Sequence, residues 1–514
     1  MTSVTELPGP VARMGQKADH SSGQELRARR RPWAARAARA ALYVVLPLVL
    51  FAWFVRSAGY YSTCFGHGLP FSSTKHRNSI EARVKRILRH NPLIDGHNDL
   101  AIWIRAYYNN HIYNETFSKP FAEGGLGGHV DIPRLRAGLN GGAFWSAFWP
   151  CPANGSDYTD ENYHRTVQQT LNQIDLLTRL QQAHSDLLLP PTLTSRQALH
   201  RFRHSRGRRL ISPLAIEGLH QIGNSAGVLR QLHALGVRYA TLTHNCGNRF
   251  ADAALWEHPA PRKAPPVWGG VSPAGRALVR EMNRLGVIVD LSHTSADTMR
   301  DVLGGGRDGW EGSLAPPIFS HSSAYALCPH PRNVPDDVLD LVGRRNGVVM
   351  VNFNPAFISC VEAPHRDDGL PDFYPPNSTL QQVVRHILHI GRRIGFDHVG
   401  LGSDFDGIAE VPEGLEDVSR FPALVAELLR QGVSDKDAAN IVGGNVLRVW
   451  TDVEAVAEKL QRAGEPPLED DLPRRIAAFD GVDGENFEDA TAFAAQQRKG
   501  EGGRGEKSTE SSFF

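Results

Sequence analysis

The chain has 514 residues, of which 56 are Lys or Arg and 55 are Asp or Glu, giving a formal net charge of +1 at pH 7. A nearly neutral chain lacks the positive field of a general nucleic-acid binder, so no nucleic-acid partner is expected. Its 49 glycines and 33 prolines are too few for a collagen-like or low-complexity protein. Histidines outnumber cysteines by 22 to 5, which favours imidazole and carboxylate ligands over thiolates at any metal site.

The N-terminus predicts a membrane anchor. Residues 1–39 are polar and rich in arginine, and residues 40–61 begin with an uncharged apolar run that Arg39 and Arg56 flank. A basic flank before an apolar run places the tail 1–39 in the cytoplasm and the rest of the chain in the lumen or outside the cell. We therefore predict a single-pass type II protein with a stalk over 62–80. A cleaved signal peptide is the alternative, although the basic region is long for one and no convincing cleavage site follows.

Two further features agree with this orientation. The glycosylation pattern N-x-[ST] occurs at Asn114, Asn154 and Asn377, all beyond the predicted anchor. All five cysteines also follow the anchor, as expected where an oxidising compartment pairs some of them. Their odd number leaves one cysteine unpaired or available to another chain.

Residues 81–462 alternate between short apolar runs and amphipathic segments, the pattern of a parallel β/α sheet. Helical spacing is clearest over 226–235, 274–285, 380–394 and 422–430. We predict an α/β fold, a (β/α)8 TIM barrel, and keep a doubly wound open sheet as the alternative. Residues 463–514 form a polar extension whose tail is expected to be disordered. The eight predicted strands are 93–95, 142–149, 211–216, 237–243, 287–291, 317–320, 348–353 and 399–402.

Residues suited to bind metal follow six of these runs. Each alone could be a turn, a cap or a buried histidine, but the carboxyl ends of barrel strands converge at one mouth. Their recurrence therefore predicts a metal site at the C-terminal ends of the strands, with nitrogen and oxygen ligands in the number that two bridged ions need. The residues are His97 and Asp99 after the first run, Glu217 after the third, His244 after the fourth, His293 after the fifth, His321 after the sixth, and Asp404 and Asp406 after the eighth.

With these residues in place, the chain resembles the membrane (renal-type) dipeptidases, zinc peptidases of the amidohydrolase-like barrel class. The resemblance covers residues 92–448 and rests on several long motifs in order. These are LIDGHNDL from Leu93, AIEG from Ala215, TLTHNC from Thr241, VDLSH from Val289, FSHSSAYALC from Phe319, RNVPDD from Arg332, VNF from Val351, GSDFDG from Gly402 and PEGLEDVS from Pro412.

The resemblance implies two zinc ions per chain. His97, Asp99 and Glu217 would hold one zinc, and Glu217, His293 and His321 the other, so that Glu217 bridges them. The charge of two ions against two carboxylates would lower the pKa of a bridging water and supply hydroxide as the nucleophile. Manganese or cobalt could occupy the same geometry.

The resemblance also implies roles for residues outside the ligand set. His244 would bind the substrate and stabilise the oxyanion formed from the scissile carbonyl. Asp404 would carry the proton from the attacking water to the leaving amine, with Asp406 as the fallback for that role. Arg332 would pair with the free carboxylate of a dipeptide, which would exclude longer peptides.

Disulfides are implied as well, joining Cys151 to Cys246 and Cys328 to Cys360. Cys64 is then left over, either as a free thiol or as a link between the chains of a homodimer. One departure concerns Phe357, where many members of the family carry a tyrosine, so the family's preference for particular substrate side chains need not transfer to this chain.

The expected function is therefore that of a membrane-anchored binuclear zinc dipeptidase with dipeptide substrates. Two alternatives remain open. A related barrel hydrolase would act on other amide bonds with the same metal centre, and an inactive binding ectodomain would use the scaffold without its chemistry. The intact set of candidate ligands argues against the second alternative.

Overall fold

The computed structural model describes residues 79–306 and 309–470. The predicted tail, the anchor, nearly all of the stalk, Cys64 and residues 471–514 of the extension lie outside these ranges. None of the helices in the described ranges has both the length and the hydrophobicity needed to cross a bilayer.

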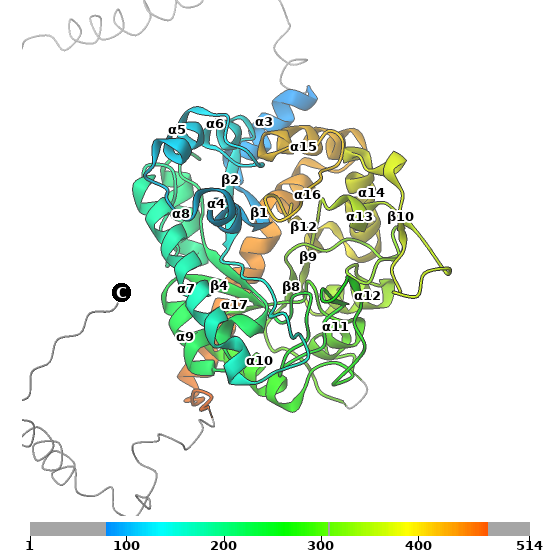
Figure 1. Cartoon of the computed structure of the whole chain (residues 1–514). Helices are drawn as coiled ribbons and strands as arrows, with labels where there is room; N and C mark the ends of the chain where they lie inside the picture. The colour runs from blue at the N-terminus through cyan, green and yellow to red at the C-terminus, as the bar shows by residue number, and fades with distance from the viewer. Residues whose placement is uncertain (1–78, 307–308, 471–514) are drawn as a thin grey trace, which may run out of the picture. The chain divides into compact units, whose positions relative to one another are not determined.

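Eight parallel strands form the central sheet, with helices arranged around it (Figure 1). Neighbouring strands follow chain order, and the two edges of the sheet meet at a parallel bridge between Asn98 and Phe405. The predicted (β/α)8 barrel is thus confirmed over the open sheet. Its strands are β1 (Leu93–Asn98), β2 (Asn140–Ser146), β3 (Leu214–Glu217), β4 (Val237–Thr241), β7 (Ile288–Asp290), β8 (Ile318–Phe319), β9 (Val348–Val351) and β12 (Val399–Leu401).

Several predicted strand ends were wrong by a few residues. Most strands stop earlier than predicted, and at some carboxyl ends a side chain accepts the next backbone hydrogen bond. After β7, for example, the Ser292 amide donates to the Asp290 carboxylate at 3.1 Å. In contrast, β1 runs three residues further than predicted and includes His97.

The four predicted helices agree with the structure to within one residue. In α14 (Leu380–Ile394), the apolar residues Val383, Ile387 and Ile390 recur at helical spacing and are buried, and the Thr379 side chain caps the first turn. The other α-helices are α3 (Ile80–His90), α4 (Leu100–Tyr108), α5 (Glu115–Glu123), α6 (Ile132–Ala137), α7 (Asp160–Ala183), α8 (Ser195–His204), α9 (Ala226–Ala234), α10 (Pro273–Leu285), α11 (Ala296–Val302), α12 (Asp336–Arg344), α13 (Pro355–Ile358), α15 (Phe421–Arg430), α16 (Asp435–Ala439) and α17 (Asn445–Arg462).

Two small antiparallel hairpins were not predicted. One pairs β5 (Leu255–Trp256) with β6 (Arg262–Lys263), and the other pairs β10 (Cys360–Val361) with β11 (Asp372–Phe373). Both are too short to show an alternating pattern in the sequence.

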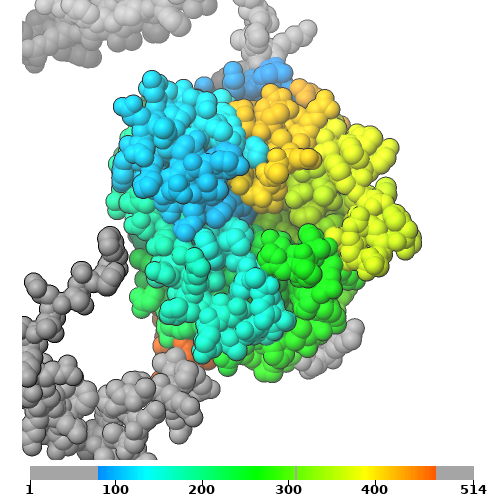
Figure 2. Space-filling view, in the orientation of Figure 1, coloured from blue at the N-terminus to red at the C-terminus, as the bar shows by residue number. Residues whose placement is uncertain are grey.

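The barrel interior is apolar toward the amino ends of its strands. Ile94, Phe144 and Ile318 pack there in one cluster with Trp450 of α17, whose indole lies 5.8 Å from the Phe144 ring between centroids. In Figure 2 the colours follow one another round the molecule from blue and cyan through green to yellow and orange, as strands in chain order require. Because the amino end is filled by apolar side chains, polar groups collect at the carboxyl end.

Candidate metal centre

Five predicted ligands meet at the carboxyl end of the barrel, and we call them the ligand cluster: His97, Asp99, Glu217, His293 and His321. Glu217 ends β3 and lies at the centre of the cluster. Its Oε2 is 3.6 Å from Nε2 of His97, while its Oε1 is 2.9 Å from Nε2 of His293. The two oxygens of one carboxylate therefore face two different sets of neighbours.

The remaining distances complete these two sets. On the first side, Asp99 Oδ2 lies 3.0 Å from His97 Nε2. On the second side, His321 Nε2 lies 3.3 Å from Glu217 Oε1 and 3.0 Å from His293 Nε2. The structure thus brings all five residues together.

Each histidine of the cluster is held through its other ring nitrogen. Nδ1 of His97 lies 2.6 Å from the Tyr239 hydroxyl, which itself donates to the Gly96 carbonyl. Since that hydroxyl proton is committed to Gly96, Nδ1 of His97 is the donor of the shorter bond. In the neutral ring Nε2 then carries the lone pair and faces the carboxylates, and this is the form in which imidazole binds metal.

The same logic applies on the second side. Nδ1 of His293 donates to Oδ1 of Asn245 at 2.9 Å. Nδ1 of His321 donates to the Ser320 hydroxyl at 2.8 Å, because that hydroxyl donates its own proton to Asp290. Burial lowers the pKa of both histidines well below the usual value, so both rings are neutral.

Such a set of atoms fits a bound cation. The Nε2 lone pairs of His293 and His321 face each other, and both atoms lie close to Oε1 of Glu217. These three acceptor atoms repel one another unless positive charge lies between them. In addition, Oδ1 of Asp99 is buried and has no hydrogen-bond partner. Uncompensated acceptors of this kind are what a divalent ion with nitrogen and oxygen ligands would satisfy.

Asp404 borders the first side of the cluster and groups with His97 and Asp99. Its backbone has a left-handed φ of 67°, held by a hydrogen bond from its amide to the His97 carbonyl. His293 has a similar φ of 64°, and strain at such positions is typical of functional sites. Burial raises the pKa of the Asp404 carboxyl well above its ordinary value, and the charge of Asp99 adds to that shift.

Asp406, the fallback for Asp404, is engaged elsewhere. Its Oδ1 accepts from the His129 amide at 2.6 Å, and its own amide donates to Nδ1 of His129. No group of candidate ligands in the described chain includes Asp406. The geometry therefore favours Asp404 for chemistry and Asp406 for fixing the loop.

Arg332 is fully buried next to the second side of the cluster. It donates weakly to the Ser322 hydroxyl and the His321 carbonyl, at 3.3 and 3.4 Å, and its Nε has no partner. Within the residues that the structure describes, no carboxylate lies within ion-pair distance of it. Burial lowers its pKa to about 10, so the guanidinium stays charged near neutral pH.

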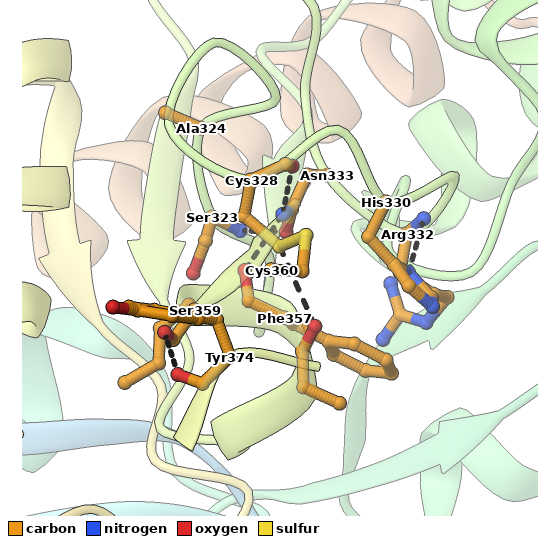
Figure 3. The surroundings of a disulfide bond; sticks show 12 residues. Ser323, Ala324, Cys328, His330, Arg332, Asn333, Phe357, Ser359, Cys360 and Tyr374 are labelled. Carbon is orange, nitrogen blue, oxygen red and sulfur yellow. Dashed lines mark hydrogen bonds between the residues drawn. A yellow bond between two sulfur atoms is a disulfide. The ribbon is translucent and has the colours of Figure 1, made fainter. Parts of the chain in front are cut away.

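The Arg332 segment is fixed by a disulfide (Figure 3). Cys328 is joined to Cys360, and Cys151 is joined to Cys246, so both implied pairings are confirmed. The Phe357 ring lies 5.3 Å from the Arg332 guanidinium and stacks near His330 at 4.4 Å between centroids. Phe357 thus covers the guanidinium with an aromatic face and brings no hydroxyl.

His244 lies beside His293, with 4.4 Å between the ring centroids. Its Nδ1 is 3.9 Å from Oε2 of Glu257, a buried oxygen without a hydrogen-bond partner. A cavity of 360 Å3 opens next to this pair, and Asn245, Trp256 and Glu257 line part of it. The His244 ring therefore contacts both His293 of the ligand cluster and Glu257.

Sequence reasoning missed the residues that orient the histidines. Asn245 and Ser320 are direct sequence neighbours of His244 and His321, so adjacency to a motif could have suggested them. Tyr239 carries no such signal, because it reaches His97 across 142 positions in the sequence. Glu257 was missed because it follows β5 in a hairpin that the sequence does not predict.

This chain is similar to known proteins over most of its length. The sequence model "Membrane dipeptidase (Peptidase family M19)" matches residues 81–464. Dipeptidase aclJ of Aspergillus oryzae is 47% identical over 397 residues, which cover 77% of this chain and 85% of that protein. An uncharacterized dipeptidase of Schizosaccharomyces pombe is also 47% identical over 397 residues, which cover 76% of this chain and 87% of that protein.

A solved metallo peptidase structure is also similar to this chain. A metallo peptidase from Rhodobacter sphaeroides, liganded with a phosphinate mimic of the dipeptide L-Ala-D-Ala, is 26% identical to this chain. The two align with a TM-score of 0.57 over 71% of this chain and 99% of the other.

Proposed function

Since the chain belongs to the membrane dipeptidase family, peptidase family M19, we propose that it is a membrane-anchored enzyme that hydrolyses dipeptides with two bridged zinc ions. The chain is a dipeptidase of this metal-dependent family. Beyond this, we propose that the metal is zinc, that Glu217 bridges two ions and that the N-terminus anchors the enzyme in a membrane. The observation that carries it is Glu217, whose two oxygens face His97 on one side and His293 on the other. A carboxylate placed in this way can bridge two ions.

In the proposed centre, His97, Asp99 and Glu217 would hold one zinc, and Glu217, His293 and His321 would hold the other. When bound, the two ions supply positive charge that lowers the pKa of a water and polarises the scissile carbonyl. Tyr239, Asn245 and Ser320 hold the three imidazoles in the tautomer that this requires.

Arg332 selects the substrate by its free carboxylate. A buried guanidinium without an ion pair is costly, and a substrate carboxylate would compensate it through charge-assisted hydrogen bonds. If that carboxylate must lie one residue beyond the scissile bond, a tripeptide would place its own carboxylate too far away. The preference for dipeptides follows from the position of one charge.

Asp404 and His244 serve the reaction itself. Asp404 takes a proton from the attacking water at a carboxylate oxygen and passes it to the nitrogen of the leaving amine, a task for which a raised pKa is suited. His244 binds the carbonyl oxygen of the substrate and stabilises the negative charge that develops there. The 360 Å3 cavity beside it has room for a substrate side chain.

The location of the enzyme forms part of the same proposal. The basic tail 1–39 and the apolar segment 40–61 favour a type II anchor with the barrel in the lumen or outside the cell. Asn114, Asn154 and Asn377 are exposed, as acceptors of glycans must be. The two disulfides suit an oxidising compartment.

A substrate panel tests the proposed function. The full-length chain, saturated with zinc, is assayed on a dipeptide, the same dipeptide with a C-terminal amide, a tripeptide and an N-acetyl amino acid. Hydrolysis of the free dipeptide alone is expected. Faster hydrolysis of the N-acetyl amino acid would instead identify a related barrel hydrolase, and no hydrolysis by a zinc-loaded chain would favour a binding role.

A further inference from the structure

A second cavity, of 660 Å3, lies at the opposite end of the barrel from the ligand cluster. Leu88 and Arg89 end α3 just before β1, and Leu139 immediately precedes β2. The loop after α8 completes the wall with residues 205–210. Because these residues precede strands and the cluster follows them, the cavity is separate from the catalytic end.

The rim of this cavity is strongly basic, and we call it the arginine pocket. It carries Arg89, Arg136, Arg206, Arg208 and Arg209, against Asp186 as the acidic residue of the lining. In the described ranges, no ion pair joins any of these arginines to a carboxylate, although arginines elsewhere, such as Arg300 and Arg393, are paired. Nε of Arg209 is buried without a hydrogen-bond partner. Arg89, Arg136, Arg206 and Arg208 are exposed, so an anionic ligand can reach them from solvent.

The floor of the pocket is apolar. Leu88, Leu135, Leu187 and Leu210 line it and are all buried. A basic rim over a leucine floor fits a ligand with an anionic head and an apolar part. Guanidinium groups bind phosphate oxygens in pairs, and the volume is in the range of pockets for small molecules.

We propose that the arginine pocket binds the phosphate group of an amphiphilic phosphate ester. Such a ligand could come from a membrane phospholipid or from a soluble phosphate ester with an apolar group. A membrane phospholipid is one possible source because only 18 residues, 62–79, separate the predicted anchor from α3 in the sequence. Fully extended, they reach about 60 Å. The site is independent of dipeptide hydrolysis, since none of its residues belongs to the ligand cluster.

Binding is tested on the full-length chain in a neutral detergent. Short-chain phosphatidic acid is titrated by calorimetry beside inorganic phosphate and short-chain phosphatidylcholine, and anionic vesicles distinguish a bilayer source from a soluble one. We expect one phosphatidic acid per chain, bound at least about tenfold more tightly than inorganic phosphate, and no comparable binding of the zwitterionic lipid.

Variants locate the site. Arg206→Gln with Arg208→Gln should weaken phosphatidic acid binding by about tenfold or more, because the double variant removes two charged donors from the rim. The matched control, Arg196→Gln with Arg344→Gln, removes the same charge from exposed arginines outside the pocket and should bind as the wild type does. Dipeptidase activity, unchanged in both, reports correct folding.

Three results would overturn the proposal. One is an absence of phosphatidic acid binding, and another is an equal loss of binding in the two double variants. The third is tight binding of inorganic phosphate or of a sulfated polysaccharide in place of the amphiphile, which would make the rim a site for simple anions or polyanions.

Discussion

Replacing Tyr239 with Phe should weaken metal binding without touching a ligand. The Tyr239 hydroxyl is fully buried, accepts from Nδ1 of His97 at 2.6 Å and donates to Gly96 at 3.1 Å. Its loss leaves the Nδ1 proton of His97 without a partner. The ring then gains by moving that proton to Nε2, which can donate to Asp99 at 3.0 Å and no longer offers a lone pair to metal.

The expected magnitude follows from this change of tautomer. A buried donor without a partner costs about 1–3 kcal/mol, and loss of such a contact to a ligating histidine lowers metal affinity about 10- to 100-fold. The assay is dipeptidase activity against buffered free zinc, which should show a half-maximal concentration raised by that factor and nearly full activity at saturation.

The matched control is Tyr163→Phe, which removes a buried hydroxyl on α7 outside the ligand cluster. It should leave the zinc dependence unchanged. If Tyr239→Phe has the same zinc dependence as the control, the hydroxyl does not set the His97 tautomer and the reasoning is refuted.

Three further changes address the substrate site and the scaffold. Arg332→Gln should raise the KM for dipeptides by about 10- to 100-fold, through loss of a charge-assisted contact; an unchanged KM would show that the guanidinium does not bind the substrate carboxylate. Asp404→Asn should lower kcat by about 10²- to 10⁴-fold with the metal content unchanged, as measured by turnover and elemental analysis; a variant with normal kcat would transfer the proton step to another group. Replacing Cys328 and Cys360 with Ala opens a link of sequence separation 32 and should lower the free energy of unfolding by about 3–4 kcal/mol; a thermal unfolding midpoint equal to the wild type would contradict this.

The sequence predicts the barrel, and the meeting of the candidate ligands at one end of it, because both depend on local patterns. Apolar runs mark the strands, and residues that follow parallel strands must converge at one end, so His97, Glu217 and His321 could be placed together. What the sequence does not predict depends on contacts between distant segments. Tyr239 meets His97 across the barrel, and the arginine pocket joins loops from separate β/α units.

Strand ends were missed for a related reason. A strand stops where a side chain replaces the next backbone partner, as the Asp290 carboxylate does for the Ser292 amide. The pattern of apolar residues in the sequence does not show where a side chain replaces a backbone acceptor. The same aspartate also accepts from Ser320 at 2.6 Å and so orients the hydroxyl that holds His321, which links the strand end to the metal centre.

The central claim is that Glu217 bridges two metal ions that the reaction needs. The most direct measurement is metal content and dipeptide hydrolysis together, on the wild type and on Glu217→Gln, with Glu362→Gln, at an exposed position, as control. We predict about two zinc ions per chain and hydrolysis in the wild type and the control, and loss of hydrolysis with reduced metal in Glu217→Gln. A folded Glu217→Gln variant with two zinc ions and full activity, or a metal-free wild type that still hydrolyses dipeptides, would contradict the claim.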